Sequence, residues 1–155
     1  MKFLYPLNDM MFIHLSLVPV LGVVGEQKTK PTQHSVKELR SVGISPDMII
    51  CRSSALLDAS TKNKLSIFCQ IHASHVFSVH DVSNIYHVPI ILTEQKIHTL
   101  IKQHLCLSDA IMSASPNFLL WNNMANIVDE IETFDMNTAV SPPPPGRLSF
   151  DLIHS

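Results

Sequence analysis

Charged residues are scarce in this sequence, and their scarcity excludes several classes of protein. They make up 15% of the chain, against about a quarter in an average soluble domain. The eleven Lys and Arg side chains are outnumbered by thirteen Asp and Glu, so the broad basic surface that holds nucleic acid is not expected. Any site for an anion must therefore be built locally, from a few residues.

Glycine and long apolar runs are also scarce. Only four glycines are present, and neither common glycine-rich phosphate loop, G-x-x-x-x-G-K-[ST] or G-x-G-x-x-G, occurs among them. No run of about 18 uncharged apolar residues exists, so we expect no transmembrane helix and no membrane partner. The apolar N-terminal region is interrupted by Asn8 and Asp9 and has no small-x-small cleavage site before Gly25, which is unlike a secretory signal.

Cysteines are too few and too far apart to form a framework. Cys51, Cys69 and Cys106 are odd in number and form no C-x-x-C. This pattern favours free thiols in a reducing compartment, packed as small hydrophobic side chains. We therefore expect a cytoplasmic location.

What the chain does contain is a pattern of alternating strands and helices. Apolar residues make up 46% of its 155 residues, enough for the core of one domain. The predicted strands are residues 11–20, 48–51 and 76–79. The first carries no charge, which is typical of a strand buried on both faces.

Helical spacing of apolar residues fills the segments between and after these strands. The predicted helices are residues 34–42, capped by Thr32 or Ser35; 60–69, capped by Ser60 or Thr61; 89–104; and 117–133. Strands followed by helices favour right-handed crossovers and an α/β fold, a Rossmann-like parallel sheet with flanking helices. Residues 141–155, which contain four consecutive prolines, are expected to form a disordered polyproline-type tail.

The residues that could carry chemistry lie in two polar turns, each after a predicted strand. The first turn is Lys28-Thr29-Lys30-Pro31-Thr32-Gln33 and the second is His80-Asp81-Val82. Open parallel sheets bind ligands at the carboxyl ends of their strands. The first turn places ammonium, hydroxyl and amide groups ahead of a helix N-terminus, which suits a phosphate chain, although the spacing alone favours a solvated basic loop.

Two other chemistries are poorly supported. His72 and His75 form an H-x-x-H, but zinc needs more converging ligands, usually with cysteine or carboxylate help. Ser78, His80 and Asp81 contain the residue types of a nucleophilic triad, but close neighbours on an extended chain do not converge in the way that a triad requires. We predict no catalytic residue and no metal ligand.

The motifs, in their order, resemble CTP synthase in its synthetase (amidoligase) half. The resemblance is carried by SLVP at 16–19, GEQKTKPTQHSVKELR at 25–40, PD at 46–47, CRS at 51–53, KLSIFC at 64–69 and HDVSNIYHVP at 80–89. These segments cover residues 12–95 almost without gaps. The resemblance implies part of a P-loop-NTPase-like amidoligase domain over residues 12–140. It also implies ATP-dependent amination of UTP to CTP in pyrimidine biosynthesis, with ammonia from glutamine as the nitrogen donor.

The resemblance also implies roles for both polar turns. It assigns binding of UTP and of the inhibitor CTP to Lys28, Thr29, Lys30, Pro31, Thr32, Gln33 and Lys64, and binding of the ATP adenine to His80, Asp81 and Val82. The lysines would neutralise triphosphate charge as point cations, while hydroxyl and amide groups would give directional hydrogen bonds.

The sequence departs from the family in several places. The family uses ATP and Mg²⁺, but its glycine-rich ATP loop, its magnesium carboxylates and its glutaminase half have no counterpart here, and Glu130-Ile131-Glu132 lies in the wrong place to supply that metal site. Residues 1–11 and 141–155 do not follow the family. We therefore expect an incomplete and inactive fragment. The alternative is a non-catalytic module, derived from the homotetrameric family, for nucleotide binding or subunit interaction.

Overall fold

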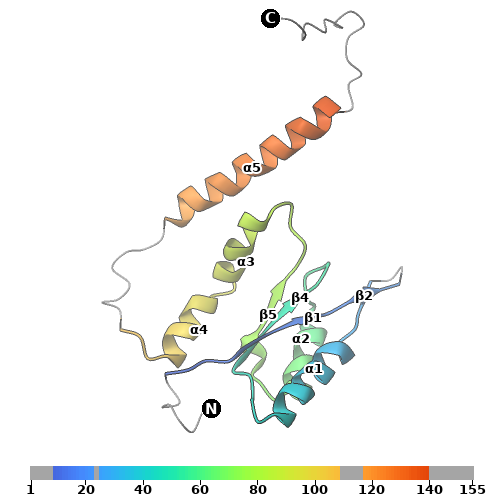
Figure 1. Cartoon of the computed structure of the whole chain (residues 1–155), viewed down its shortest axis with the longest axis vertical. Helices are drawn as coiled ribbons and strands as arrows, with labels where there is room; N and C mark the ends of the chain where they lie inside the picture. The colour runs from blue at the N-terminus through green and yellow to red at the C-terminus, as the bar shows by residue number, and fades with distance from the viewer. Residues whose placement is uncertain (1–8, 23–24, 109–116, 140–155) are drawn as a thin grey trace, which may run out of the picture.

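A short parallel sheet organises the molecule, and helices flank it. The computed structural model describes residues 9–22, 25–108 and 117–139, with side chains described as far as Ile131. The sheet strands are β1 (Ile13–Leu17), β4 (Met48–Arg52) and β5 (Val76–Val79), in the order β1-β4-β5. The helices α1 (Lys30–Ser41) and α2 (Ala59–Cys69) pack on one side of the sheet, and α3 (Val88–Glu94) and α4 (Ile97–His104) lie on the other (Figure 1). The predicted α/β fold with a parallel sheet is confirmed.

Strands β4 and β5 are largely buried, and they carry almost no charge. Ile13 of β1 pairs with Met48 of β4 in a parallel register, and Ile49 of β4 pairs with Val76 of β5. All four residues of β5 are buried. The core contains residues from strands and from both α1 and α2: Val18, Val36, Ile49, Cys51, Leu57, Leu65, Cys69 and Val76.

Strand β1 corrects the expectation of a strand buried on both faces. Ile13, Leu15 and Leu17 are 43%, 69% and 58% exposed, because no described helix covers this face of β1, whereas β5, at the other edge of the described sheet, is covered by α3. Its polar residues point the other way: His14 contacts Ser35 of α1 in a side-chain hydrogen bond. The uncharged run predicted the strand correctly, but not its place in the sheet.

The predicted starts of the first two helices shift, whereas the end of α2 at Cys69 agrees with the prediction. Helix α1 begins at Lys30 instead of His34, with Thr29 as N-cap and Pro31 in its first turn, where the fixed φ of proline suits a helix. Helix α2 is capped by Asp58, whose carboxylate accepts a 2.5 Å hydrogen bond from the Thr61 backbone, and not by Ser60 or Thr61. A two-residue hairpin of β2 (Val20–Leu21) and β3 (Glu26–Gln27) between β1 and α1 was not predicted.

The prediction of a single helix over residues 89–104 is wrong, because the helix is interrupted between α3 and α4. Lys96 takes a φ of 60° at the break. The neighbouring Gln95 side chain donates to the Ser78 carbonyl at 2.7 Å and accepts from the Ser78 backbone N–H at 3.0 Å. The Gln95 side chain thus makes the two hydrogen bonds to β5 that the backbone of a neighbouring strand residue would make. These bonds fix the position of the interruption between α3 and α4. The last predicted helix is confirmed as α5 (Phe118–Ala139); residues 141–155 lie outside the described residues.

The three cysteines are free thiols, as expected, but not all three are buried. Cys51 and Cys69 lie in the core, whereas Cys106 is exposed. Burial raises the pKa of Cys51 to about 12, so this thiol stays protonated and unreactive at neutral pH. Within the described residues, none of the helices combines the length and apolar character needed to cross a membrane.

The packing of α2 predicts a contrast between two of its apolar residues. Leu65 is fully buried, whereas Ile67 is 73% exposed. We expect Leu65→Ala to lower the free energy of unfolding by about 2–4 kcal/mol through lost burial and the cavity left behind, and Ile67→Ala to change it by less than about 0.5 kcal/mol. Urea unfolding followed by circular dichroism measures both; equal losses would contradict this packing of α2.

Candidate functional site

The first polar turn is held to the sheet by buried threonines. Thr32 is fully buried; its hydroxyl donates to the Leu17 carbonyl at 3.1 Å and accepts from the Ser16 hydroxyl at 3.0 Å. Thr29 is also buried and accepts a 3.0 Å hydrogen bond from the Gln33 side chain. These bonds leave the turn little freedom where it follows the carboxyl end of β1.

The charges of two lysines act on one carboxylate at the start of this turn. Lys28 Nζ lies 2.5 Å from a carboxylate oxygen of Glu26. The hydrogen bond and charge of Lys28 lower the pKa of Glu26, and the charge of Lys64 on α2 lowers it further. Lys28 thus already pairs with an anionic group, and Lys64 adds positive potential at the same place.

Gln27 fixes the distance between this turn and α2. Its side chain donates to the Leu56 carbonyl at 2.7 Å and accepts from the Asp58 backbone N–H at 3.1 Å. Asp58 caps α2, so one side chain links the hairpin that precedes the turn to the start of the helix that carries Lys64.

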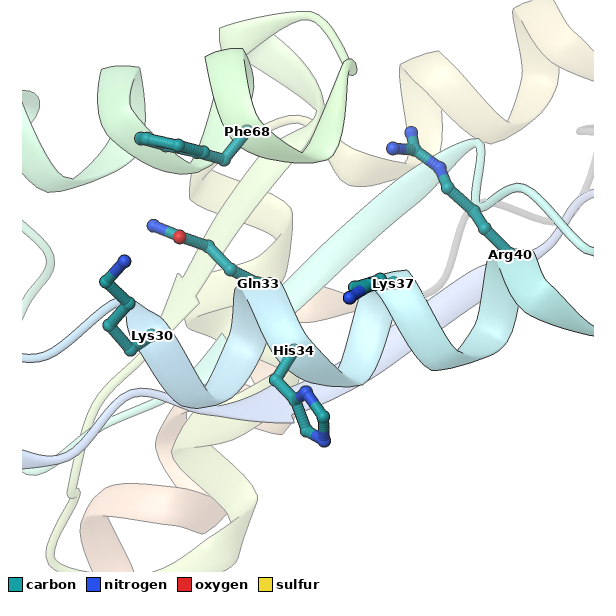
Figure 2. A pocket seen from close by; sticks show the side chains of 6 residues that line it. All are labelled: Lys30, Gln33, His34, Lys37, Arg40 and Phe68. Atoms are coloured by element: carbon teal, nitrogen blue, oxygen red, sulfur yellow. The ribbon is translucent and has the colours of Figure 1, made fainter.

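A basic cleft of about 380 Å³ continues from the turn along α1 and α2. Figure 2 shows the residues that line it: Lys30, Gln33, His34, Lys37, Arg40 and Phe68. Gln33 points toward Phe68 on the neighbouring helix, and Arg40 donates a hydrogen bond to the Cys69 carbonyl. Its three cationic side chains, with no Asp or Glu among the described lining residues, suit a polyanionic ligand.

Sequence reasoning found Lys30 and Gln33 but missed the rest of this cleft. Lys37 and Arg40 follow Lys30 and Gln33 at helical spacing, and this periodicity could have placed all four on one helix face. The contribution of Phe68 depends on how α2 packs against α1, for which the sequence carries no local signal.

The second polar turn separates its three predicted residues. Asp81 forms an ion pair with Arg52, at the end of the neighbouring strand β4. His80 and Val82 instead line a cavity of about 390 Å³ between this turn, α3 and α5. Both turns thus lie at the carboxyl end of the sheet, but the second faces the layer of α3 and α5.

Asp129 anchors α5 beside the second turn. Its two carboxylate oxygens accept from Asn84 at 2.6 Å and from the His87 ring at 2.7 Å. Nearer the start of α5, the Trp121 indole donates a hydrogen bond to the Tyr86 carbonyl at 2.7 Å, and the Trp121 ring packs edge to face against the Tyr86 ring. Hydrogen bonds from Ser83 and then His87 lower the pKa of Asp129.

Neither region assembles ligands for a metal ion. No three His, Cys, Asp or Glu side chains converge in the part of the chain that the structure describes. The His72 ring bonds to the Ser74 hydroxyl at 2.7 Å, and the His72 and His75 rings lie 6.0 Å apart. The described residues therefore do not fit the magnesium site that the resemblance implies for the whole enzyme.

The anchoring of α5 predicts an acid-dependent stability. A carboxyl whose pKa is lowered by folding stabilises the fold above its ordinary pKa of 3.8, and this contribution is lost as the pH falls through the lower folded value. We expect Asp129→Asn to be less stable than the natural chain at pH 7, with the gap closing below that ordinary pKa.

Urea unfolding at several pH values, followed by Trp121 fluorescence, measures this gap. Trp121 is the single tryptophan and lies against Tyr86, so its emission reports the docking of α5. Glu38→Gln, on an exposed position of α1, is the control. A stability difference that does not change with pH would contradict the role of the Asp129 carboxylate.

Comparison with known proteins agrees with the resemblance seen in the sequence. Residues 1–107 match a family model described as "CTP synthase N-terminus". The chain is 42% identical over 144 residues to CTP synthase of Dictyostelium discoideum, covering 88% of this chain and 25% of that protein. It is 47% identical over 122 residues to CTP synthase 2 of Homo sapiens, covering 77% of this chain and 20% of that protein.

A bacterial relative gives the same result: the match to CTP synthase of Hydrogenobaculum sp. (strain Y04AAS1) is 43% identical over 125 residues, or 81% of this chain and 23% of that protein. The chain thus spans about a fifth to a quarter of the length of these curated relatives. With a matching fold and two polar turns at the carboxyl end of its sheet, the chain belongs to the CTP synthase family.

Proposed function

We propose that this chain is a nucleotide-binding part of a CTP synthase synthetase domain, and that the reaction it serves is the ATP-dependent amination of UTP to CTP. The observation that carries the proposal is the basic cleft, which contains Lys30 and Gln33 and follows a turn where Lys28 pairs with Glu26 and the charge of Lys64 lowers the pKa of the same carboxyl. Lys28, Lys30 and Gln33 lie in the turn and at the start of α1, and Lys64 lies on α2. A convergence of cations at one cleft is typical of binding to a triphosphate.

In this proposal, the residues of the first turn divide into ligands and supports. Lys28, Lys30 and Lys64 neutralise the triphosphate of UTP or CTP, and Gln33 presents its amide at the cleft. Thr29 and Thr32 are buried and already hydrogen-bonded, so they position the turn, and Pro31 sets the start of α1. The triphosphate replaces Glu26 at Lys28, because it offers more negative charge than one carboxylate.

The second turn takes the adenine nucleotide in the same proposal. His80 and Val82 line the second cavity, while Asp81 holds the turn against β4 through Arg52. In the proposed reaction ATP phosphorylates the 4-oxygen of uracil, and ammonia from glutamine then displaces phosphate. The residues described here bind and orient the two nucleotides; none of them is assigned a covalent step. A tetrameric assembly and a cytoplasmic location remain part of the proposal.

The binding role is tested by removing the converging lysines. We expect the double variant Lys28→Ala/Lys30→Ala, and separately Lys64→Ala, to bind UTP and CTP at least about tenfold more weakly, because each loses a charge-assisted contact to phosphate. Lys62→Ala is the matched control: Lys62 lies on α2 with Lys64, but the charge of Lys64, and not that of Lys62, acts on Glu26 in the turn.

Isothermal titration calorimetry of the 155-residue chain with each nucleotide measures these affinities. A natural chain with no saturable heat, or variants that bind as it does, would count against the proposed site. Binding should also weaken with added salt, since the contacts are ionic.

A second candidate function is a module that binds nucleotide without catalysis. It is favoured because no group of three or more His, Cys, Asp or Glu side chains that could hold a metal ion occurs in the described residues, and phosphoryl transfer depends on metal-assisted charge neutralisation. We expect the 155-residue chain, incubated with UTP, ATP, Mg²⁺ and ammonium, to form no CTP above background, while an intact CTP synthase in the same buffer does. CTP detected by chromatography with the chain alone would rule this candidate out.

A further inference from the structure

The second cavity differs in charge from the basic cleft. Its described lining contains no Lys or Arg but does contain two carboxylates, Glu94 and Asp129. Its apolar part is formed by Val82, Ile90 and Ile91. A triphosphate would be repelled here, whereas a flat, uncharged group with hydrogen-bond donors would fit, and about 390 Å³ lies within the usual range for ligand pockets.

The two carboxylates of the cavity are not equivalent. Both oxygens of Asp129 are already used by Asn84 and His87. Glu94 stands exposed at the end of α3, and nothing in the residues that the structure describes forms a hydrogen bond or ion pair with it. Its two oxygens remain available to accept hydrogen bonds from a pair of neighbouring hydroxyl groups, as the acidic residue of a dinucleotide fold does with ribose.

Polar groups also lie on the other walls of the cavity. Asn122 contributes an amide from α5, which can both donate and accept a hydrogen bond. His80 lines the cavity and keeps a buried Nδ1 without a partner among the described residues. An amide and an imidazole beside three aliphatic side chains suit a heteroaromatic base that packs on the aliphatic groups and presents hydrogen-bonding atoms at its edge.

We propose that this cavity holds the nucleoside end of the adenine nucleotide, with Glu94 as the acceptor for the ribose 2′- and 3′-hydroxyls and α5 as the outer wall. The base lies against Val82, Ile90 and Ile91, and the phosphates leave the cavity, away from its carboxylates. The proposal rests on the proposed function, which puts ATP at the turn of His80 to Val82. It adds the residue that recognises the ribose and a helix that the resemblance did not assign to the site.

The test compares adenosine with 2′,3′-dideoxyadenosine on the whole 155-residue chain. We expect the natural chain to bind adenosine about tenfold more tightly than the dideoxy compound, since only adenosine can donate to Glu94. Glu94→Ala should lower the affinity for adenosine about tenfold and leave the affinity for dideoxyadenosine unchanged. Glu38→Ala, another exposed helical glutamate, is the matched control and should keep the preference for adenosine.

The variant is expected to fold, because alanine is a strong helix former and Glu94 is exposed. Circular dichroism and binding of UTP, which should not change in Glu94→Ala, check this directly. Equal affinities for the two nucleosides, no effect of Glu94→Ala, or a preference kept by that variant would each overturn the proposal.

The same titrations separate this proposal from the proposed function. If UTP binds and adenosine does not, the nucleoside cavity is wrong and the triphosphate site of Lys28, Lys30 and Lys64 stands. If ATP binds and Glu94→Ala has no effect on adenosine, only the role of Glu94 fails. If neither UTP nor ATP binds, the proposed function fails together with this inference.

Discussion

The buried hydroxyl of Thr32 is the contact on which the first site depends. It joins the first turn of α1 to Ser16 and to the Leu17 carbonyl at the end of β1, where both a donor and an acceptor would be costly to leave unpaired. The bond fixes how far α1 begins beyond the strand, and with it the positions of Lys30 and Gln33. Without this anchor the lysines would belong to a solvated loop, the alternative that their spacing alone leaves open.

The basic cleft and the second cavity lie on opposite sides of the sheet and carry opposite charges. On the side of α1 and α2, Lys30, Lys37 and Arg40 line one cleft; on the side of α3 and α5, Glu94 and Asp129 line the other cavity. The first region follows β1 and the second follows β5, both at the carboxyl edge of one sheet. A nucleotide has an anionic end and an uncharged end, so in the proposed function this arrangement would let one small sheet recognise opposite ends of two nucleotides.

Local patterns predicted much of this molecule, and long-range contacts explain the remainder. The strands and the two polar turns follow from apolar runs and the residues after them. The exposure of Leu15 could not be predicted, because an uncharged run does not say which faces of a strand are covered by helices. The break before α4 depends on Gln95 reaching Ser78 of β5, and the cleft depends on Phe68 packing beside α1. None of these contacts has a local sequence signal.

Asp129 is one of several residues that hold α5; Ala125 and Trp121 also bond to the segment that follows the second turn. Ser83, Asn84 and His87 all direct hydrogen bonds to Asp129, and they belong to the segment that directly follows the turn of His80 to Val82. A change in that turn is therefore passed to α5 through Asp129 as well as through Ala125 and Trp121, and a displacement of α5 moves Asn122 in the wall of the second cavity. The turn and the helix consequently shape the cavity together, although they are far apart in the sequence.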